Sequence, residues 1–168
     1  MSPSAQAVQD QLVALLPRLR RFARALARDV HDADDLVQVA VERALLHSDQ
    51  LRPGTRVESW MFGIIRNAWI DENRARRRRD KVLAPEELGE HVADNASDAP
   101  IQRLSIQAAL ERLPEEQRLV VALVLIEGLA YKEAAAVLEV PIGTVTSRLA
   151  RGREALEALL GGREGGTQ

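Results

Sequence analysis

The sequence predicts an all-α protein made of two small helical domains joined by a flexible linker, the second domain containing a helix-turn-helix. Apolar residues recur at helical spacing along most of the 168 residues, whereas the alternation typical of strands does not develop. Aromatic residues make up only 3% of the chain, so the core has to be aliphatic, which favours packed helices over a sheet. Proline, glycine and acidic residues interrupt the helical pattern at 81–100.

Residue usage narrows the class of protein further. The chain has no Cys, which excludes a disulfide framework, thiolate catalysis and Cys-based zinc sites and favours an intracellular setting. Residues 1–11 are polar, unlike a signal peptide, and no apolar run approaches the length needed to cross a bilayer. We therefore expect a cytoplasmic protein with no membrane insertion of its own.

Positive charge is local in this chain. The net charge is −2, with 14 basic and 11 acidic residues in 1–80, one basic and five acidic residues in 81–100, and eight basic and nine acidic residues in 101–168. Arginines cluster at 74–79 and again at 148–153. So small an overall charge argues against tight non-specific DNA binding by the free protein, but a protein that a partner delivers to DNA tolerates it.

The most informative segment is 128–153, which predicts two short helices around a tight turn. Pro141 suits the start of the second helix because its missing N–H costs nothing there, and Val145 and Leu149, four apart, form the inward face. The outer face supplies the hydroxyls and guanidiniums that a recognition helix needs in a major groove. These residues are Thr144, Thr146, Ser147, Arg148, Arg151 and Arg153. The alternative interpretation is a helical hairpin whose charged face is only solvated.

Apolar spacing places the other helices. The first is expected at about 6–28, and the second opens near Asp32, which suits an N-cap. A turn-rich loop at 48–56 precedes a third helix, which starts near Val57 and extends into the arginine cluster.

In the C-terminal half, helices are expected at about 99–113 and 114–127, followed by the hairpin, which ends near Leu160. The predicted organisation is a first domain at 1–80, a flexible acidic linker at 81–100 and a second domain at 101–168.

Several segments of the chain resemble a known protein family. Asp32–Gln38, Val57–Asn67 and the arginines at 74–79 resemble the second conserved region of bacterial sigma factors. Leu110–Arg118 and the hairpin ending in Gly143–Arg148 resemble their fourth region. Because only these two regions are present, separated by a linker, the layout is similar to the small extracytoplasmic-function (ECF) sigma factors.

The resemblance implies that the second helix docks on a coiled coil of the RNA polymerase clamp. Carboxylates and an amide on one side of that helix suit a basic partner surface. The implied polymerase-binding residues are Asp34, Asp35, Gln38 and Glu42. Acids also favour the start of a helix, so a capping role is the alternative, and both roles are compatible.

The loop at 49–56 and the start of the third helix match the part of such proteins that recognises the downstream promoter element as a single strand. An extruded base needs stacking partners and hydrogen bonds to its edge, and the amide of Asn67 offers donors and an acceptor. Trp60, Phe62 and Trp69 are candidates for stacking, although helical placement favours a core position for Trp60. The implied DNA-contacting residues are Arg56, Arg66, Asn67, Arg74, Arg77 and Arg78.

Two positions depart from the family pattern. Glu139 stands in the hairpin turn where glycine is frequent, and a left-handed conformation there costs on the order of 1 kcal/mol. Gly152 lies in the basic end of the recognition helix and is expected to loosen it by up to about 1 kcal/mol relative to alanine.

The sequence therefore predicts a sigma factor that binds core RNA polymerase and directs promoter recognition and transcription initiation, with a cognate anti-sigma factor implied by the resemblance. The alternatives are an autonomous helix-turn-helix regulator and a sigma-like protein that sequesters an anti-sigma factor. Catalysis has little support, because His31, His47 and His91 lie in different segments and no phosphate loop or nucleophile elbow is present. We predict no enzymatic activity, no cofactor and no metal.

Overall fold

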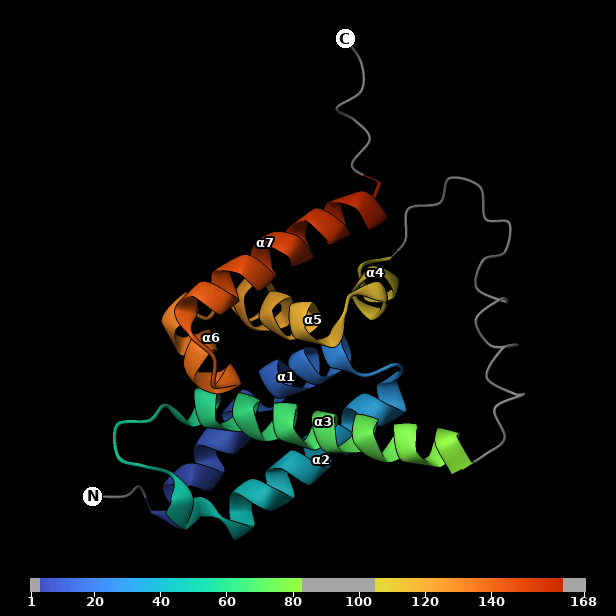
Figure 1. Cartoon of the computed structure of the whole chain (residues 1–168). Helices are drawn as coiled ribbons and strands as arrows, with labels where there is room; N and C mark the ends of the chain where they lie inside the picture. The colour runs from blue at the N-terminus through green and yellow to red at the C-terminus, as the bar shows by residue number, and fades with distance from the viewer. Residues whose placement is uncertain (1–3, 83–104, 162–168) are drawn as a thin grey trace.

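The computed structural model describes residues 4–82 and 105–161, and all regular structure in these two stretches is helical (Figure 1). The predicted all-α fold is confirmed. The helices are α1 (Ala5–Leu26), α2 (Val30–Leu46), α3 (Val57–Val82), α4 (Ile106–Arg112), α5 (Glu115–Val121), α6 (Tyr131–Leu138) and α7 (Ile142–Leu159), with a 3-10 turn η1 (Ser48–Gln50) and a π-helical turn η3 (Ala122–Ile126).

Helices α1, α2 and α3 pack against one another around a core that contains three buried aromatic side chains. Phe22 of α1 and Phe62 of α3 meet edge to face, with 5.0 Å between ring centroids. Trp69 is also buried, whereas Trp60 lies half-buried against the core. Burial removes Phe62 and Trp69 as candidates for base stacking, because their faces are occupied by protein.

The N-cap of α2 is Asp29, and the expectation of Asp32 is wrong. Asp29 Oδ1 accepts the N–H of Asp32 at 2.8 Å, which satisfies one of the free donors of the first turn. The Asp32 carboxylate instead accepts a hydrogen bond from Arg76 Nη2 at 2.7 Å, joining α2 to α3. This hydrogen bond raises the pKa of Arg76. Aspartate is a suitable N-cap residue at either position, so the sequence alone does not distinguish them. The contact with the distant Arg76 is what gives Asp32 a different role.

The boundaries of the middle helices also differ from expectation. Helix α3 continues through Val82, and the remainder of the predicted linker lies outside the described residues. Helix α4 begins at Ile106 behind the cap Ser105, while residues 99–104 of that prediction again lie outside the described part. After Val121 the next helix widens into the π turn, where the N–H of Glu127 donates to the carbonyl of Ala122 at 2.9 Å.

The predicted helix-turn-helix is present as α6 and α7. Glu139 is left-handed, with φ 56°, and its N–H caps the carbonyls of the last turn of α6. Val145 and Leu149 are buried, as their spacing predicts. The turn therefore carries the strain anticipated for a non-glycine residue at this position.

Gly152 has a packing role that its sequence context does not reveal. It is buried where α7 crosses α5, and a Cβ built on it would lie 2.7 Å from Val121 Cγ2. A contact so short requires the Val121 side chain or one of the two helices to shift. The glycine allows the close crossing, so the loss of helix propensity is offset by packing.

Gly152→Ala is expected to destabilise the protein by about 1–3 kcal/mol, because the methyl group overpacks the α5–α7 contact. Helix propensity alone predicts the opposite sign. Urea unfolding of the full chain measures the difference. Gly143→Ala is the matched control, since its Cβ would meet no atom within 4 Å. A more stable Gly152→Ala protein would contradict this account.

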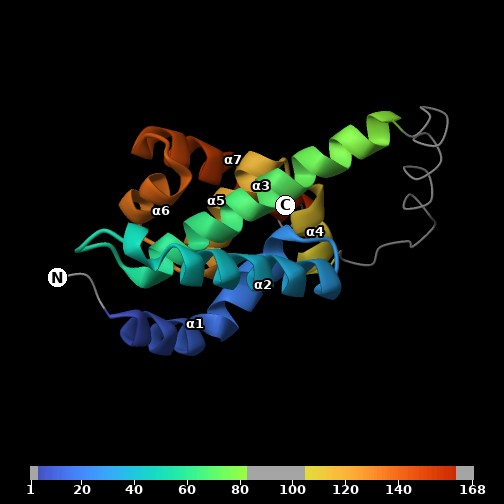
Figure 2. The ribbon, with the colours of Figure 1, turned by 90° about the horizontal axis from the view of Figure 1, so that it is seen from below.

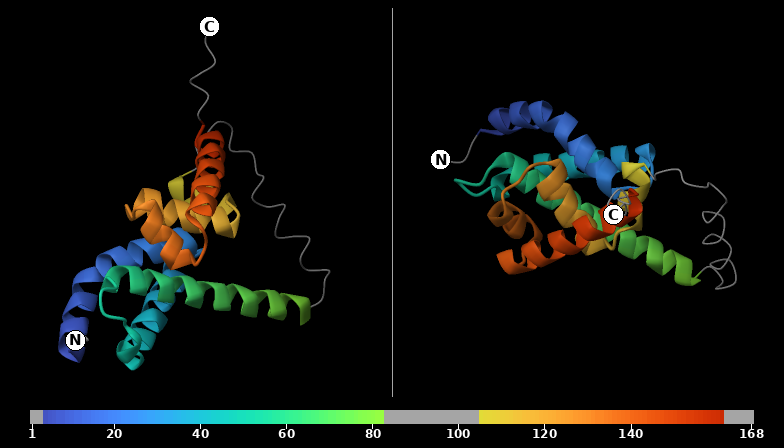
Figure 3. Two further views of the ribbon diagram at one scale, coloured as in Figure 1. Left: turned by 60° about the vertical axis from the view of Figure 1, so that its left-hand side comes forward. Right: turned by 90° about the horizontal axis from the view of Figure 1, so that it is seen from above.

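The C-terminal helices pack directly on the N-terminal ones (Figures 2 and 3). Helix α6 lies against α3, and α4, α5 and η3 lie against α1. The side-chain amide of Gln107 donates to the carbonyls of Arg24 and Ala27 at the end of α1, at 2.7 and 3.3 Å. Buried apolar residues from both halves form one continuous cluster.

Candidate polymerase and nucleic-acid interfaces

Helix α2 presents the predicted polymerase-binding residues on its surface. Asp34, Asp35, Gln38 and Glu42 are all exposed, and the Gln38 amide donates to Glu42 Oε1 at 3.4 Å. The opposite side of the helix, with Leu36, Val37 and Ala40, is buried in the core. Burial of that side fixes the orientation of the helix, so the carboxylates point into solvent.

Sequence reasoning missed two apolar members of the same surface. Val39 is 37% exposed and Leu46 is 76% exposed, and they follow Asp35 by four and eleven residues, on the same helical face. Single exposed apolar residues are common on protein surfaces, so it is their position on the face of the carboxylates that makes Val39 and Leu46 candidates for the same surface. The sequence signal was available, because these positions break the period of the inward-facing residues.

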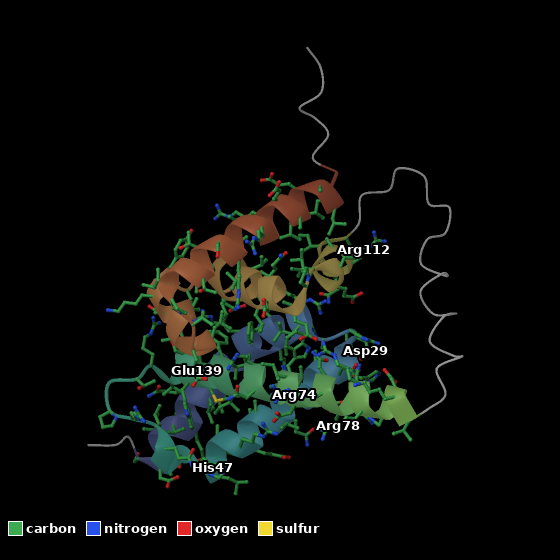
Figure 4. All side chains as sticks on the ribbon, viewed as in Figure 1. Asp29, His47, Arg74, Arg78, Arg112 and Glu139 are labelled. Atoms are coloured by element: carbon green, nitrogen blue, oxygen red, sulfur yellow. The ribbon has the colours of Figure 1, made fainter. Side chains whose placement is uncertain are left out.

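The predicted downstream-DNA residues, of which Arg56 precedes α3 and the others lie on it, fall into two groups. Asn67, Arg74 and Arg78 are exposed, and Figure 4 shows Arg74 and Arg78 on the half of α3 that extends away from Glu139 and the α6–α7 turn. The Asn67 amide oxygen accepts a hydrogen bond from Arg66 Nη1 at 3.1 Å. This group presents cationic side chains to solvent, as phosphate contacts require.

The other group comprises arginines that are paired with carboxylates from the C-terminal half. Arg56 Nη1 lies 3.2 Å from Glu133 Oε2 of α6, and Arg66 Nη1 lies 4.0 Å from Glu139 Oε2. Further along α3, Arg77 pairs with Glu115 of α5. The fold therefore divides the predicted downstream-DNA arginines into those that pair with carboxylates of the C-terminal half and those that have no such pair within residues 4–82 and 105–161.

Helix α7 carries the predicted upstream-DNA residues, and they are not equivalent. Arg151 and Arg153 are exposed, whereas Arg148 lies against α5, with Nη2 3.6 Å from Glu116 Oε2. The hydroxyls of Thr146 and Ser147 donate to helix carbonyls, those of Ile142 and Thr144, at 3.1 and 3.2 Å. Each hydroxyl oxygen keeps its capacity to accept a hydrogen bond. Thr144 is half-buried near the start of the helix.

A cleft of about 960 Å³ lies where α2 and α3 face α4 and α5. Its apolar part includes Leu36 and Trp69, and charged side chains of both signs surround it. The guanidinium of Arg118 lies over the Trp69 ring, 5.8 Å from its centroid. Both halves of the molecule therefore contribute to a single concave, amphipathic surface.

Two further properties concern only the residues that the structure describes. None of their helices has the length and apolar character needed to span a bilayer. No group of three or more His, Asp or Glu side chains among them is arranged to hold a metal ion.

Comparisons with known proteins agree with this layout. The family model described as Sigma-70 region 2 matches residues 12–79, and the model described as Sigma-70, region 4 matches residues 103–156. These spans include all of α2, α4, α5 and α6 and most of α1, α3 and α7. Regions 2 and 4 in this order, on an all-helical fold, define a sigma factor.

Individual relatives indicate which kind of sigma factor this is. The chain is 35% identical over 158 residues to the ECF RNA polymerase sigma factor EcfG of Rhodopseudomonas palustris, covering 94% of this chain and 87% of that protein. It is 39% identical over 144 residues to SigM of Mycobacterium tuberculosis H37Rv, covering 86% and 72%. The sigma factor RpoE of Bartonella quintana, solved in complex with the anti-sigma factor NepR, matches with a TM-score of 0.74 at 30% identity, over 90% of this chain and 95% of that one. The protein belongs to the ECF RNA polymerase sigma factor family.

Proposed function

We propose that this chain binds core RNA polymerase and directs it to a set of promoters. The observation that carries the proposal is the presence of both sigma regions, in order, each with its characteristic charged surface exposed on a helix. The fold supports separate binding roles for the two regions, because their charged surfaces come from different halves of the chain. As a member of this family it acts by binding, and we infer that it carries out no catalysis of its own.

The α2 surface is the proposed polymerase contact. Asp34 and Asp35 offer charge for a basic coiled coil, and Val39 and Leu46 add apolar area that docking would bury. Because the polymerase contact precedes DNA binding, delivery to DNA by the large partner compensates for the near-neutral charge of the free chain.

The α3 and α7 surfaces are the proposed DNA contacts. Asn67 with the arginines of α3 would hold the downstream element as a single strand, and α7 would enter the major groove at the upstream element. We assign the first role to residues 1–80 and the second to 101–168, with 81–100 as the connection between them. We infer a cytoplasmic location, where polymerase and promoters are found.

A cognate anti-sigma factor is the further partner we propose. Bartonella quintana RpoE was solved in complex with the anti-sigma factor NepR. The cleft between α2, α3, α4 and α5 supports a similar association here, because a partner seated there would contact both halves at once.

Run-off transcription with purified core polymerase tests the proposal. A sigma factor converts core enzyme into a form that starts at defined promoters. An autonomous regulator would bind DNA without conferring initiation on core enzyme, and a sigma-like sequestering protein would do neither while still binding an anti-sigma factor. Promoter-independent transcripts only, from core enzyme saturated with this chain, would refute the assignment.

The recognition helix gives a prediction about sequence preference. Arg148, nearer the start of α7, is expected to recognise base edges once it leaves its pair with the exposed Glu116, so Arg148→Ala loses about 1–3 kcal/mol of discrimination among upstream elements. Arg153→Ala is expected to weaken all promoters alike and to shallow the salt dependence by about one phosphate contact. Holoenzyme binding to a promoter library at two salt concentrations distinguishes these effects. Full sequence preference in Arg148→Ala would show that the helix is oriented differently in the groove.

A further inference from the structure

Glu127 is the one charged residue buried in the described part of the chain, and its partners lie on another element. Its side chain is fully inaccessible to solvent. Arg18 Nε donates to its carboxylate at 3.2 Å, and Arg21 donates through Nε and Nη2, both at 2.8 Å. The bidentate hydrogen bond raises the pKa of Arg21. A buried carboxylate depends on such partners, so Glu127 binds the end of η3 tightly to α1.

The same arginine extends the connection into a network. Arg18 also donates to the backbone carbonyl of Glu127 at 2.9 Å and pairs with Glu58 of α3. Glu58 in turn lies 2.8 Å from Arg56 Nη2, and Arg56 reaches Glu133 of α6. Charges of alternating sign thus form a chain, which begins and ends on carboxylates of the C-terminal half and passes through three residues of the N-terminal half.

This closed arrangement has a consequence for DNA. With the network formed, Arg56 faces Glu133, Arg66 faces Glu139 and Arg77 faces Glu115. Each of these arginines belongs to the surface proposed to contact the downstream element. Phosphates and carboxylates compete for the same guanidinium donors, so DNA must displace acids that the C-terminal half supplies.

We propose that the Glu127–Arg18–Arg21 cluster is an intramolecular latch, which holds the free chain closed and keeps the downstream-DNA arginines occupied by the chain's own carboxylates. The proposal rests on the proposed DNA role of those arginines. The latch is released when the two halves separate, and Glu127, Arg18 and Arg21 then become hydrated independently. It makes single-strand binding depend on an opening step that polymerase or DNA has to drive.

The latch and simple electrostatics predict opposite changes in DNA affinity when a positive charge of the cluster is removed. Glu127→Gln removes the negative charge of the buried carboxylate, while Arg21→Gln removes the positive charge of its half-exposed partner. Either change weakens the closed state without changing the open one, so both raise the fraction of open protein. Simple electrostatics predicts that losing Arg21 weakens DNA binding. The latch predicts that it strengthens binding, because the apparent affinity scales with the open fraction.

The experiment measures binding of the full chain to a fluorescein-labelled, mixed-sequence 20-nucleotide single strand by anisotropy. We expect Glu127→Gln and Arg21→Gln each to bind at least about fivefold more tightly than the unchanged protein. Glu157→Gln on α7 is the control for the loss of one exposed negative charge, and we expect less than a twofold effect. Circular dichroism establishes that each variant is folded.

A distance between two spin labels, one on each half of the chain, measures whether the free chain is closed. Because the chain has no Cys, Thr55→Cys and Lys132→Cys accept nitroxide labels selectively, and these exposed positions adjoin the paired Arg56 and Glu133. A short distance that lengthens and broadens in Arg21→Gln supports the latch. A long distance in the otherwise unchanged protein, or weaker DNA binding by Arg21→Gln, overturns it. Should Glu127→Gln fail to fold, Arg21→Gln still decides between the outcomes.

The latch and the sigma function fail in different ways. If run-off transcription is promoter-specific while neither variant binds the strand more tightly, the sigma function stands and the latch is refuted. If both variants open and bind more tightly while core enzyme gains no specificity, the latch stands and the sigma assignment falls.

Discussion

Alanine at both Asp34 and Asp35 is expected to weaken binding of the full chain to core RNA polymerase by at least about 30-fold, equivalent to about 2 kcal/mol. Truncating one partner of a desolvated charge pair costs about 2–5 kcal/mol, because the opposite charge is left without a partner. Both carboxylates are exposed on α2 and form no part of the core, so the fold is expected to survive the change.

Surface plasmon resonance with immobilised core enzyme measures this loss directly. Asp10→Ala on α1 removes one exposed carboxylate outside the proposed docking surface and serves as the control for the loss of a surface negative charge. Single-strand DNA binding by the free chain is expected to remain unchanged in the double variant. Equal affinity for core polymerase in the double variant and in the unchanged protein would rule out α2 as the docking surface.

Arg118→Met is expected to lower the free energy of unfolding by about 3 kcal/mol or more. The guanidinium donates to the carbonyls of Leu26 at 3.1 Å, Glu111 at 2.6 Å and Leu113 at 3.2 Å, which joins the C-terminal ends of α1 and α4 at one point. Hydrogen bonds from a charged donor contribute about 1.5–3 kcal/mol each, and the acceptors left behind are desolvated. Arg118 is half-buried, and this burial lowers its pKa.

Urea unfolding followed by circular dichroism provides the measurement. Arg112→Met, an exposed arginine on the neighbouring helix α4, is the matched control and is expected to change stability by less than about 0.5 kcal/mol. Methionine keeps an unbranched apolar stem but loses the guanidinium that lies over Trp69, so the difference between the two variants measures the carbonyl hydrogen bonds and the cation–π contact together. A loss below 1 kcal/mol in Arg118→Met would mean that water replaces the guanidinium at little cost.

The exposure of many candidate site residues could be predicted from the sequence, because it depends on the spacing of apolar residues within one helix. The inward positions Val145 and Leu149 fixed the face of α7, and with it the exposure of Arg151 and Arg153. The exposure of Asp34 and Asp35 followed in the same way from the apolar residues of α2. Helical periodicity is an average over many residues, so it survives errors at individual positions.

Single-residue roles were less predictable wherever the partner is remote. Asp32 was expected to cap α2, yet it pairs with Arg76, 44 positions away. Gly152 was expected to weaken α7, yet it permits the crossing with Val121 of α5. Phe62 and Trp69 were candidates for stacking on bases, yet both are buried.

The sequence by itself determined the helical class, the order of the two sigma regions and the outward face of each functional helix, because these follow from spacing along the chain. Only the tertiary structure decided that Glu127 would be buried between Arg18 and Arg21, and that Arg56, Arg66 and Arg77 would meet carboxylates of the C-terminal half. Charge pairing acts over a few ångströms in space, and residues more than a hundred positions apart come that close only when the helices pack.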